Sequence, residues 1–355
     1  MSFNAQRVLD AIAALPLGEI RLMEVCGTHT MAIARSGIRT MLPENVRLLS
    51  GPGCPVCVTP GEVIDSVLEL SMRPGVVLAT YGDMVRVPGS TPGDNLARRR
   101  ALGARIEVVY SPVDAVDLAE KNPDKEVVFL GVGFETTAPG TAAAVLTARE
   151  RGLTNFSLLS MLKTVEPALR ALIASEGFCV QGFLCPGHVA TIIGERGFDF
   201  LPREFSLPAV IAGFEPEDIL SAVYLLLRQL AEGKSLVQNE YRRAVAPEGN
   251  PLARAVMEKC FVPRRDLWRG LGAIERSGLA LREELAAFDA EKKFDITCAA
   301  APKATACRCG EVITGRLGPN ECPLFGRRCT PEDPVGPCMV SSEGACAAYY
   351  KYQSV

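Results

Sequence analysis

The sequence predicts an α/β protein in which two parallel-sheet units face a central cleft, followed by a cysteine-rich domain. From about residue 20 to residue 232, short β-rich runs alternate with segments of helix length. Such alternation is typical of parallel sheets covered by helices on both faces. From Cys298 onward Gly, Pro and Cys dominate. A segment of that composition needs cross-links or a metal to fix its structure, because it cannot build an apolar core.

The individual elements follow from the runs of β-branched residues and from the breaks between them. Strands are predicted at 20–25, 46–50, 76–80, 105–110, 126–131, 156–161, 180–184 and 209–212. Helices between them include 60–72, 112–121, 140–151 and 165–176. After Gly233 longer helical stretches are expected. We place domain boundaries so that 21–122 and 123–235 form the two α/β units. Residues 1–20 and 236–355 form the helical and cysteine-rich domain, with the N-terminal helix packed against it.

Composition narrows the class of protein. With 48% hydrophobic and 22% charged residues the chain is expected to fold. Its net charge of −3 does not indicate a basic surface for binding nucleic acid. The basic run Arg98-Arg99-Arg100 is interpreted as a solvated helix end. No secretory signal and no apolar run of about 18 residues is visible, so a cytoplasmic protein without a membrane span is expected. Clustered cysteines in that compartment favour metal binding or redox chemistry over structural disulfides.

The thirteen cysteines fall mainly into two groups. The first group consists of Cys26, Cys54 and Cys57, which follow the first two predicted strands. The second group begins at Cys298 and comprises Cys298, Cys307, Cys309, Cys322, Cys329, Cys338 and Cys346. Of the remaining three, Cys179 and Cys260 are assigned to core packing and Cys185 is left unassigned. The grouping predicts two separate thiol sites.

Polar residues follow five of the predicted strands. Because ligand sites in open α/β sheets form beyond the carboxyl ends of strands, these turns are expected to converge on one cleft. The turns contain Cys26, then Cys54 with Cys57, then Tyr81-Gly82-Asp83, then Glu135-Thr136-Thr137, and finally Cys185-Pro186-Gly187-His188.

Cys26 has two interpretations, and so does the pair Cys54 and Cys57. A helix that starts near Cys26 would stabilise its thiolate, and His29 could lie on the same side; the alternative is a buried cysteine beside a capping threonine. The spacing of Cys54 and Cys57 is that of disulfide exchange and also of half a zinc site. Together with Cys26 and His29, this pair would complete a zinc site of three cysteines and one histidine. We favour reactive thiols, because a closed zinc site would block the cleft.

Two further residues are candidates for the same cleft. Glu135 could orient a ligand or accept a proton, although an acid at a helix start is also explained by the helix dipole. His188 could act in the site or be structural. The short Gly131-Val132-Gly133 lacks the third glycine of a dinucleotide fingerprint, so a nucleotide site is disfavoured.

The C-terminal cysteines have irregular spacing, starting with the pair Cys307-x-Cys309. Four or more cysteines in a segment rich in Gly and Pro suit a [4Fe–4S] cluster held by loops. Zinc remains the alternative, although two regular C-x-x-C pairs are lacking.

Four motifs in the first two thirds of the chain, and the cysteine-rich ending, resemble the HypD family. The motifs are residues 24–30 (EVCGTHT), 51–57 (GPGCPVC), 133–139 (GFETTAP) and 186–189 (PGHV). The ending runs from CRCG at 307–310 through CPLF at 322–325 to CMVSSEGAC at 338–346. The resemblance covers nearly the whole chain in the same order. It implies an iron–sulfur scaffold, or metallochaperone with redox activity, for maturing [NiFe] hydrogenases rather than a turnover enzyme.

The resemblance also implies partners and cargo. With the small chaperone HypC the protein would hold an iron atom that gains one CO and two cyanide ligands. HypE would deliver the cyanide, made with HypF upstream, and the Fe(CN)2CO unit would then pass to the hydrogenase large subunit.

The resemblance assigns roles to individual residues as well. Cys26 would bind the iron, assisted by His29 and by a HypC cysteine, and Cys54 and Cys57 would be the redox pair. Glu135 and His188 are expected at the same site because of their positions at strand ends, not because of the resemblance. The expected [4Fe–4S] ligands are Cys309, Cys322, Cys329 and Cys346, with Cys338 or Cys307 as alternatives. A different function, an iron–sulfur-dependent disulfide reductase using Cys54 and Cys57, fits the same two groups. A zinc-stabilised interaction module is the third option.

Overall fold

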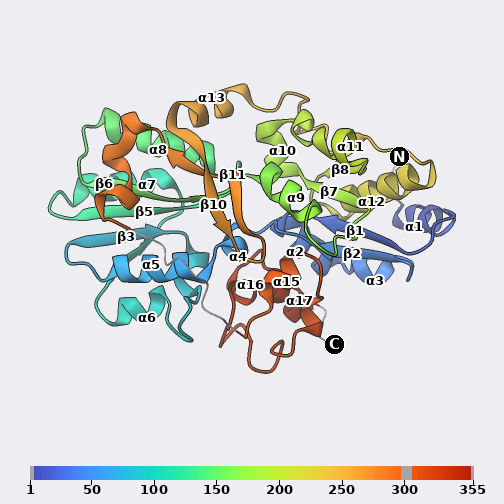
Figure 1. Ribbon diagram of the computed structural model, residues 1–355, viewed down its shortest axis with the longest axis horizontal. Coiled ribbons are helices and arrows are strands. Elements are labelled where there is room, and N and C mark those ends of the chain that lie inside the picture. Colours follow the sequence, from blue (N-terminus) through green and yellow to red (C-terminus); the bar gives the residue numbers. More distant parts are fainter. Residues whose placement is uncertain (1–3, 297–305, 353–355) are drawn as a thin grey trace.

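The computed structural model describes residues 4–296 and 306–352, so that Cys298 lies outside the described residues. Two parallel β-sheets lie side by side in an elongated molecule, and the cysteine-rich C-terminal segment packs below their junction (Figure 1). This arrangement confirms the predicted α/β class. The eight predicted strands all form, with their ends shifted by a few residues.

The first sheet has the strand order β2-β1-β7-β8-β9, and all its strands are parallel. Its strands are β1 (Ile20–Glu24), β2 (Val46–Ser50), β7 (Gly182–Pro186), β8 (Ala209–Ala212) and β9 (Val237–Asn239). The helices of this unit are α1 (Ala5–Ala13), α2 (Gly27–Ser36), α3 (Ile38–Met41), α10 (Gly187–Ile193), α11 (Phe200–Phe205) and α12 (Pro216–Ala231), with a 3-10 turn at Glu195–Phe198. In the register, Leu22 of the interior strand β1 lies between Leu48 of β2 and Gly182 of β7.

The second sheet has the order β4-β3-β5-β6 and is also parallel. Its strands are β3 (Val76–Thr80), β4 (Arg105–Val108), β5 (Glu126–Gly133) and β6 (Phe156–Leu162). The helices around it are α5 (Gly61–Ser71), α6 (Leu96–Ala101), α7 (Pro112–Lys121) and α8 (Ala138–Glu150), with a 3-10 turn at Gly82–Arg86. Val127 and Phe129 pack in the core that includes α7 and α8, whereas Val128 and Leu130 pack in the core that includes α5. Burial on both faces explains the continuous apolar runs of these strands.

The chain crosses between the sheets twice. After β2 it passes through α4 (Pro55–Val58) and α5 into the second sheet, and after β6 it returns through α9 (Val165–Ile173) to β7. The sheets therefore do not divide the chain at residue 122, because β1 and β2 pair with strands that follow residue 180. The two α/β domains as bounded above remain a prediction.

Residues 261–281 form an antiparallel hairpin where helices were expected. The helix α13 (Pro251–Cys260) is followed by β10 (Phe261–Trp268) and β11 (Gly272–Leu281). The charged residues Arg264 and Asp266 hide the strand alternation, because in this hairpin they turn inward and pair with charged side chains. The helix prediction was wrong because the buried Lys163–Asp266 pair and the partly buried Arg264–Glu291 pair look like solvated charge in the sequence.

The two chain ends pack differently from expectation. The helix α1 packs on α12 of the first sheet rather than on the cysteine-rich segment. That segment contains α15 (Cys309–Ile313), α16 (Pro337–Val340) and α17 (Ala345–Tyr352), with a 3-10 turn at Pro319–Glu321; before it lie a turn at Glu283–Phe288 and α14 (Ala290–Lys293). It packs through α17 on α2, and through α15 and α16 on α4. Within the described ranges, no helix combines the length and apolar character needed to cross a bilayer.

Candidate functional site

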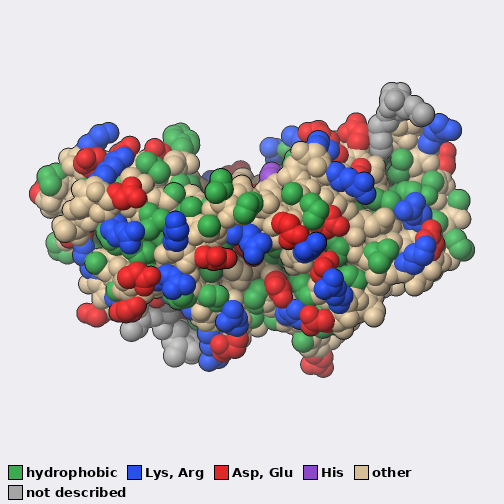
Figure 2. Space-filling view, turned by 90° about the horizontal axis from the view of Figure 1, so that it is seen from above, with side chains coloured by type: hydrophobic (Ala, Val, Ile, Leu, Met, Phe, Trp, Pro, Cys, Tyr) green, Lys and Arg blue, Asp and Glu red, His purple; other side chains and the backbone are tan. Residues whose placement is uncertain are grey.

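Four of the five predicted strand-end turns meet at one cavity, as the carboxyl-end rule predicted. This cavity, called here the Cys26 cavity, has a volume of about 120 Å³. It is lined by Val25, Cys26, Thr28, Gly53, Pro55, Phe134, Thr136, Thr137, Pro186, His188, Val189 and Glu343. Residues from both sheets and from the cysteine-rich segment therefore contribute. Figure 2 shows the surface hollowed between the two lobes, with histidine atoms at this dip.

Cys26 lies at the N-cap of α2, directly beyond β1. Its backbone is extended, and the turn is packed so closely on Gly53 that a Cβ there would collide with the Cys26 backbone. Burial raises the pKa of the Cys26 thiol to about 12, although the backbone N–H groups of His29 and Thr28 act in the opposite direction. The expected helix-end effect is present, but burial outweighs it. The free thiol is therefore protonated at neutral pH.

The buried carboxyl group of Glu24 holds the Cys26 turn by hydrogen bonds. Oε2 of Glu24 accepts the Cys26 backbone N–H at 3.2 Å, and Oε1 accepts the Thr30 hydroxyl at 2.6 Å. Burial raises the pKa of Glu24 to about 7, partly offset by Arg39 at 3.6 Å. Sequence reasoning missed Glu24, whose position inside a strand gave no sign of this contact.

The two histidines lie on the same aromatic ring but differ in exposure. His29 is fully buried, stacks on Phe214 at 4.7 Å between centroids, and places Nε2 2.8 Å from the carbonyl oxygen of Gly213. Burial lowers the pKa of His29 to about 4, so its ring is neutral. Its Nδ1 finds no hydrogen-bond partner within the described part of the chain. His188 stacks on Phe214 at 3.9 Å and lines the Cys26 cavity, which His29 does not.

Glu343 brings the cysteine-rich segment into the Cys26 cavity. Its Oε1 accepts a hydrogen bond of 2.9 Å from the Thr28 hydroxyl, and burial raises its pKa. A Cβ at Gly27 would collide with the Glu343 side chain, so the glycine permits this close approach. Sequence reasoning missed Glu343 as a site residue, although it lies in the quoted SSEGAC motif.

Glu135 lies outside the Cys26 cavity, although its neighbours Phe134, Thr136 and Thr137 line it. Its side chain faces a second cavity on the other side of the turn. Oε1 accepts the Val165 backbone N–H at 2.9 Å, whereas the buried Oε2 has no hydrogen-bond partner among the described residues. Burial raises the pKa of Glu135 to about 7.

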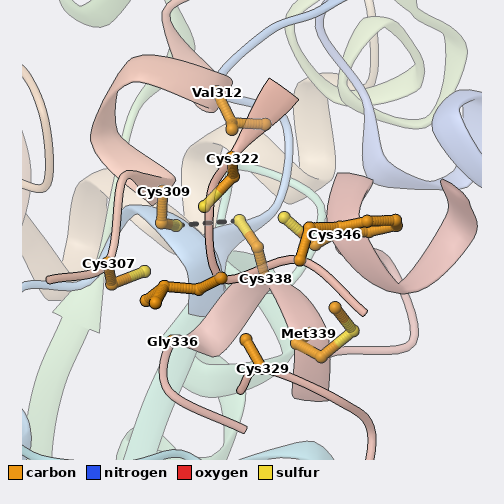
Figure 3. A pocket seen from close by; sticks show the side chains of 11 residues that line it. Cys307, Cys309, Val312, Cys322, Cys329, Gly336, Cys338, Met339 and Cys346 are labelled. Atoms are coloured by element: carbon orange, nitrogen blue, oxygen red, sulfur yellow. Dashed lines mark hydrogen bonds between the residues drawn. The ribbon is translucent and has the colours of Figure 1, made fainter. Parts of the chain in front are cut away.

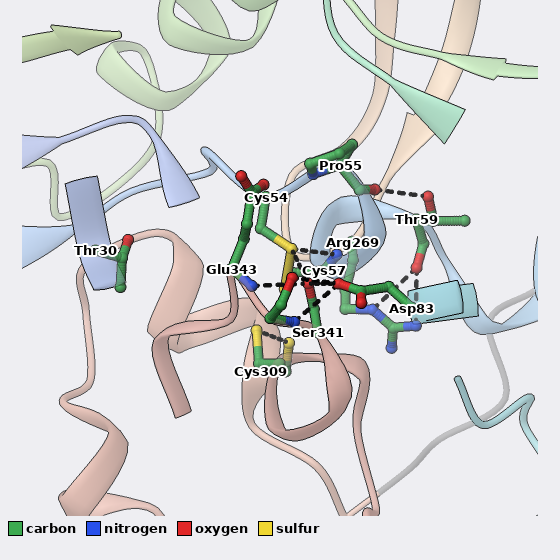
Figure 4. The surroundings of a disulfide bond; sticks show 12 residues. Thr30, Cys54, Pro55, Cys57, Thr59, Asp83, Arg269, Cys309, Ser341 and Glu343 are labelled. Atoms are coloured by element: carbon green, nitrogen blue, oxygen red, sulfur yellow. Dashed lines mark hydrogen bonds between the residues drawn. A yellow bond between two sulfur atoms is a disulfide. The ribbon is translucent and has the colours of Figure 1, made fainter. Parts of the chain in front are cut away.

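A disulfide joins Cys54 and Cys57, the pair with the spacing of disulfide exchange. Figure 4 shows its surroundings. Gly53 and Pro55 on either side of Cys54 line the Cys26 cavity, while α4 packs on α15 and α16 of the cysteine-rich segment. The Cys57 backbone N–H donates to the Cys54 sulfur at 3.1 Å. The disulfide therefore lies between the Cys26 cavity and the second group of cysteines.

The second group of cysteines encloses a cavity of its own, called here the six-cysteine cavity (Figure 3). Its volume is about 20 Å³. The lining consists of Cys307, Cys309, Val312, Cys322, Leu324, Phe325, Cys329, Gly336, Cys338, Met339 and Cys346. The four expected cluster ligands and both alternatives thus share one cavity, whose other side chains are apolar.

The thiols of the six-cysteine cavity influence each other's protonation. Hydrogen bonds from Cys307 and Cys338, together with the charge of Arg269, hold the pKa of Cys309 well below its usual range. The sulfurs of Cys309 and Cys338 lie 2.9 Å apart. The same contacts raise the pKa of Cys307 and Cys338, because a second thiolate beside the first is unfavourable.

The six cysteines of this cavity form a donor set that fits an iron–sulfur cluster. Within residues 4–296 and 306–352, no group of three or more His, Cys, Asp or Glu side chains is arranged to hold one metal ion. Thiolates around a cluster instead bind different iron atoms and therefore lie farther apart. Several soft sulfur donors in a dry cavity are the surroundings such clusters have in proteins.

The other three cysteines lie outside both cavities. Cys260 is buried in the core, as predicted, and Cys185 is buried too. Cys179 was predicted to pack in the core, but it is exposed and its sulfur accepts a hydrogen bond of 2.9 Å from Arg21. Its neighbours Phe178 and Val180 are apolar, but the Cys179 side chain itself lies at the surface beside the Arg21 guanidinium.

Comparison with known proteins places this chain among hydrogenase-related sequences. The family model described as "HypD: Hydrogenase formation hypA family" matches residues 4–353. The chain is 47% identical to the "Hydrogenase maturation factor HypD" of Azotobacter vinelandii, covering 96% of this chain and 92% of that protein. It is 44% identical to the protein of the same name from Rhodobacter capsulatus, covering 98% and 93%. With the protein of that name from Escherichia coli (strain K12) it shares 45% identity over 94% and 89%.

Proposed function

Since this chain belongs to the HypD family, we propose that it is a hydrogenase maturation factor on which the Fe(CN)2CO unit of [NiFe] hydrogenases is assembled. It acts as an iron–sulfur scaffold rather than as an enzyme that turns over a free substrate. The observation that carries the proposal is the succession of three thiol sites, in which a disulfide separates the Cys26 cavity from the six-cysteine cavity.

Cys26 receives the iron atom, which is cargo rather than a resident cofactor. A thiolate is a soft donor that suits low-spin iron with strong-field ligands. The backbone N–H groups of Thr28 and His29 support the thiolate once the proton has left. The cavity has room for the cyanide and CO ligands and for a cysteine of a HypC-like chaperone, and His188 stands at its lining as a further polar contact. His29 supports the site from within the core.

Cys54 and Cys57 supply electrons when cyanide is delivered by a HypE-like partner that carries it as a thiocyanate, made with a HypF-like protein upstream. Release of cyanide breaks the S–C bond and needs two electrons, leaving a thiolate on the partner. Closure of the Cys54–Cys57 dithiol to the disulfide gives up two electrons and two protons, so the exchange balances. The position of the pair beside the Cys26 cavity supports this role.

Cys309, Cys322, Cys329 and Cys346 hold a [4Fe–4S] cluster, with Cys307 and Cys338 as alternative ligands. When bound, the cluster supplies electrons one at a time to restore the dithiol. The low pKa of Cys309 supports this assignment, because a ready thiolate is what an iron atom binds first.

Infrared spectroscopy of the anaerobically purified complex tests the proposal. The chain is co-produced with its HypC-like and HypE-like partners, and bands of CN and CO stretching are expected in the complex. Iron in excess of the cluster should accompany them. A complex formed with all partners that shows neither band would overturn the proposal.

A disulfide reductase for an external substrate is the competing function. It needs a disulfide that another protein or a small molecule can reach. Cys54 is 5% exposed and Cys57 is fully buried, so neither thiolate is well placed to attack the disulfide of a bulky external substrate. This burial favours the scaffold over the reductase.

A further inference from the structure

Asp83, Ser341 and Cys54 form a continuous chain of polar contacts beside the disulfide (Figure 4). The Ser341 Oγ lies 3.3 Å from the Cys54 sulfur and 3.3 Å from Oδ2 of Asp83. Ser341 is buried, with 1% of its surface exposed, whereas Asp83 is partly exposed. The chain therefore leads from a buried sulfur atom to a carboxylate that water can reach.

The hydrogen bonds around Ser341 define which of its atoms can face Cys54. Oδ2 of Asp83 also accepts the backbone N–H of Ser342 at 2.9 Å and the Ser342 hydroxyl at 2.7 Å, which fixes the carboxylate to this turn. The Glu343 backbone N–H donates to the Ser341 oxygen at 3.2 Å. A serine hydroxyl has one hydrogen and two lone pairs. The Ser341 hydroxyl hydrogen is directed to Asp83, and one lone pair accepts the Glu343 backbone N–H. The second lone pair therefore faces the Cys54 sulfur.

We propose that Ser341 and Asp83 form a proton relay for Cys54, which acts when the Cys54–Cys57 disulfide opens and closes. The proposal rests on that part of the proposed function in which these two cysteines are a redox pair. Sequence separation hides the relay, because Asp83 and Ser341 are 258 positions apart.

The chemistry of the relay can be written for a dithiol reductant. The reductant supplies the electron pair, the S–S bond between Cys54 and Cys57 breaks, and the reductant closes to its own disulfide. Both cysteines leave as thiolates and take up the two protons that the reductant gives up. Asp83 takes up a proton from water, the Ser341 hydroxyl turns and gives its own proton to the Cys54 thiolate, and the Ser341 oxygen takes the proton from Asp83. On oxidation the proton follows the reverse path.

Other charged groups near the disulfide are directed elsewhere. The Glu343 carboxylate accepts from Thr28, on the side of the Cys26 cavity. The Arg269 guanidinium donates to the Thr59 carbonyl at 2.9 Å, and Arg86 donates to the Pro331 carbonyl at 2.6 Å. Of these groups, Asp83 is the one that bonds to Ser341. Its charge is therefore linked to Cys54 through the Ser341 hydroxyl.

The test uses the full-length protein, purified anaerobically and reduced with dithiothreitol that is then removed. The rate of Cys54 alkylation by iodoacetamide is followed against pH by peptide mass spectrometry, which separates Cys54 from Cys57. In Asp83→Asn the midpoint of this profile should fall by about one pH unit, because Ser341, no longer held by a carboxylate, can turn its hydroxyl to the Cys54 thiolate and stabilise it. Ser342→Ala is the matched control: it removes another hydroxyl from the same Oδ2 and should leave the midpoint in place.

A double-mutant cycle shows whether Asp83 acts through Ser341. In the Ser341→Ala background, Asp83→Asn should no longer move the midpoint, because the connecting oxygen is gone. An unchanged midpoint in Asp83→Asn, or an equal shift with and without Ser341, overturns the relay. Failure of dithiothreitol to reduce the pair in the unaltered protein overturns its redox role instead, which is a distinguishable result. Circular dichroism of each variant verifies that it is folded.

Discussion

The hydroxyl of Thr28 donates a hydrogen bond of 2.9 Å to Oε1 of Glu343, which lies 315 positions later in the chain. Thr28 belongs to the first turn of α2, directly after Cys26, and Glu343 belongs to the cysteine-rich segment. The wall of the Cys26 cavity is therefore complete only when that segment is docked. Iron binding at Cys26 is expected to depend on the fold of the cysteine-rich segment even though its cysteines lie elsewhere.

Replacement of Cys26 by Ala should abolish the CN and CO bands and remove the iron that exceeds the cluster. The visible absorption of the cluster should remain, because Cys26 does not line the six-cysteine cavity. Infrared spectra and iron analysis of the co-purified complex measure both. Cys179→Ala removes an exposed cysteine and serves as control. A cyanide-bearing complex formed by Cys26→Ala would show that another residue holds the iron.

Replacement of Cys322 or Cys329 by Ala should bleach the sulfur-to-iron absorption and loosen the cysteine-rich segment, because metal binding contributes to the folding of such segments. Absorption spectra and limited proteolysis of the anaerobic protein measure the two effects. Cys307→Ala should retain the absorption if Cys307 is not a ligand. If Cys307→Ala loses the sulfur-to-iron absorption and Cys322→Ala keeps it, Cys307 is a cluster ligand and Cys322 is not.

Glu135→Gln should change how stability depends on pH. Burial raises the pKa of Glu135 in the folded protein from 4.5 to about 7. A carboxyl with a raised pKa stabilises the fold fully below its unfolded pKa, and this contribution is lost as pH rises through about 7. The protein should therefore lose about 3 kcal/mol relative to Glu135→Gln between about pH 4.5 and pH 7, since one pKa unit is about 1.4 kcal/mol.

Urea unfolding of both proteins at several pH values measures this difference. Glu44→Gln, which alters an exposed carboxyl, is the control and should follow the unaltered protein. Parallel stability profiles for Glu135→Gln and the unaltered protein would contradict a raised pKa at Glu135.

Lys163→Ala should destabilise the packing of the β10–β11 hairpin on the second sheet. The Lys163 ammonium donates to Oδ2 of Asp266 at 2.6 Å and to the Leu267 carbonyl at 3.0 Å, and its side chain is 2% exposed. Removal of one partner leaves the Asp266 carboxylate buried, so the free energy of unfolding should fall by about 3 kcal/mol or more.

Two comparisons test the cause of that loss by urea unfolding. Lys163→Met combined with Asp266→Leu should lose less than Lys163→Ala, because no charge stays unpaired. Arg265→Ala breaks an exposed pair with Glu275 and should cost less than about 1 kcal/mol. Similar losses for Arg265→Ala and Lys163→Ala would mean that burial of the pair does not matter.

Most of the parallel strands could be predicted because their residues are apolar on both faces. Val128 and Phe129 pack in different cores, so the run carries no polar interruption. The grouping of strands into sheets could not be predicted. It depends on which strand each crossing reaches, and nothing local to β2 or β6 indicates that the chain leaves one sheet for the other.

The part of the site at strand ends was predicted, whereas its contacts over long sequence distances were not. Cys26, Thr136 and His188 follow strands, and the carboxyl-end rule places them together. Glu343 and Ser341 reach the site through tertiary packing of a segment without periodicity, for which sequence has no comparable rule. The orientation of Glu135 away from the Cys26 cavity also depends on a single turn of the backbone.

The composition of the first sheet has a consequence for synthesis of the chain on the ribosome. Cys26 emerges early, but β1 pairs with β7, which ends at residue 186, and the sheet is completed by β9 at residues 237–239. All four strands of the second sheet lie in the sequence between β2 and β7. The second sheet can therefore fold before the first sheet is complete. Glu343 is synthesised after all of these strands. A nascent chain that has not reached Glu343 therefore lacks part of the wall of the Cys26 cavity, the proposed site for iron.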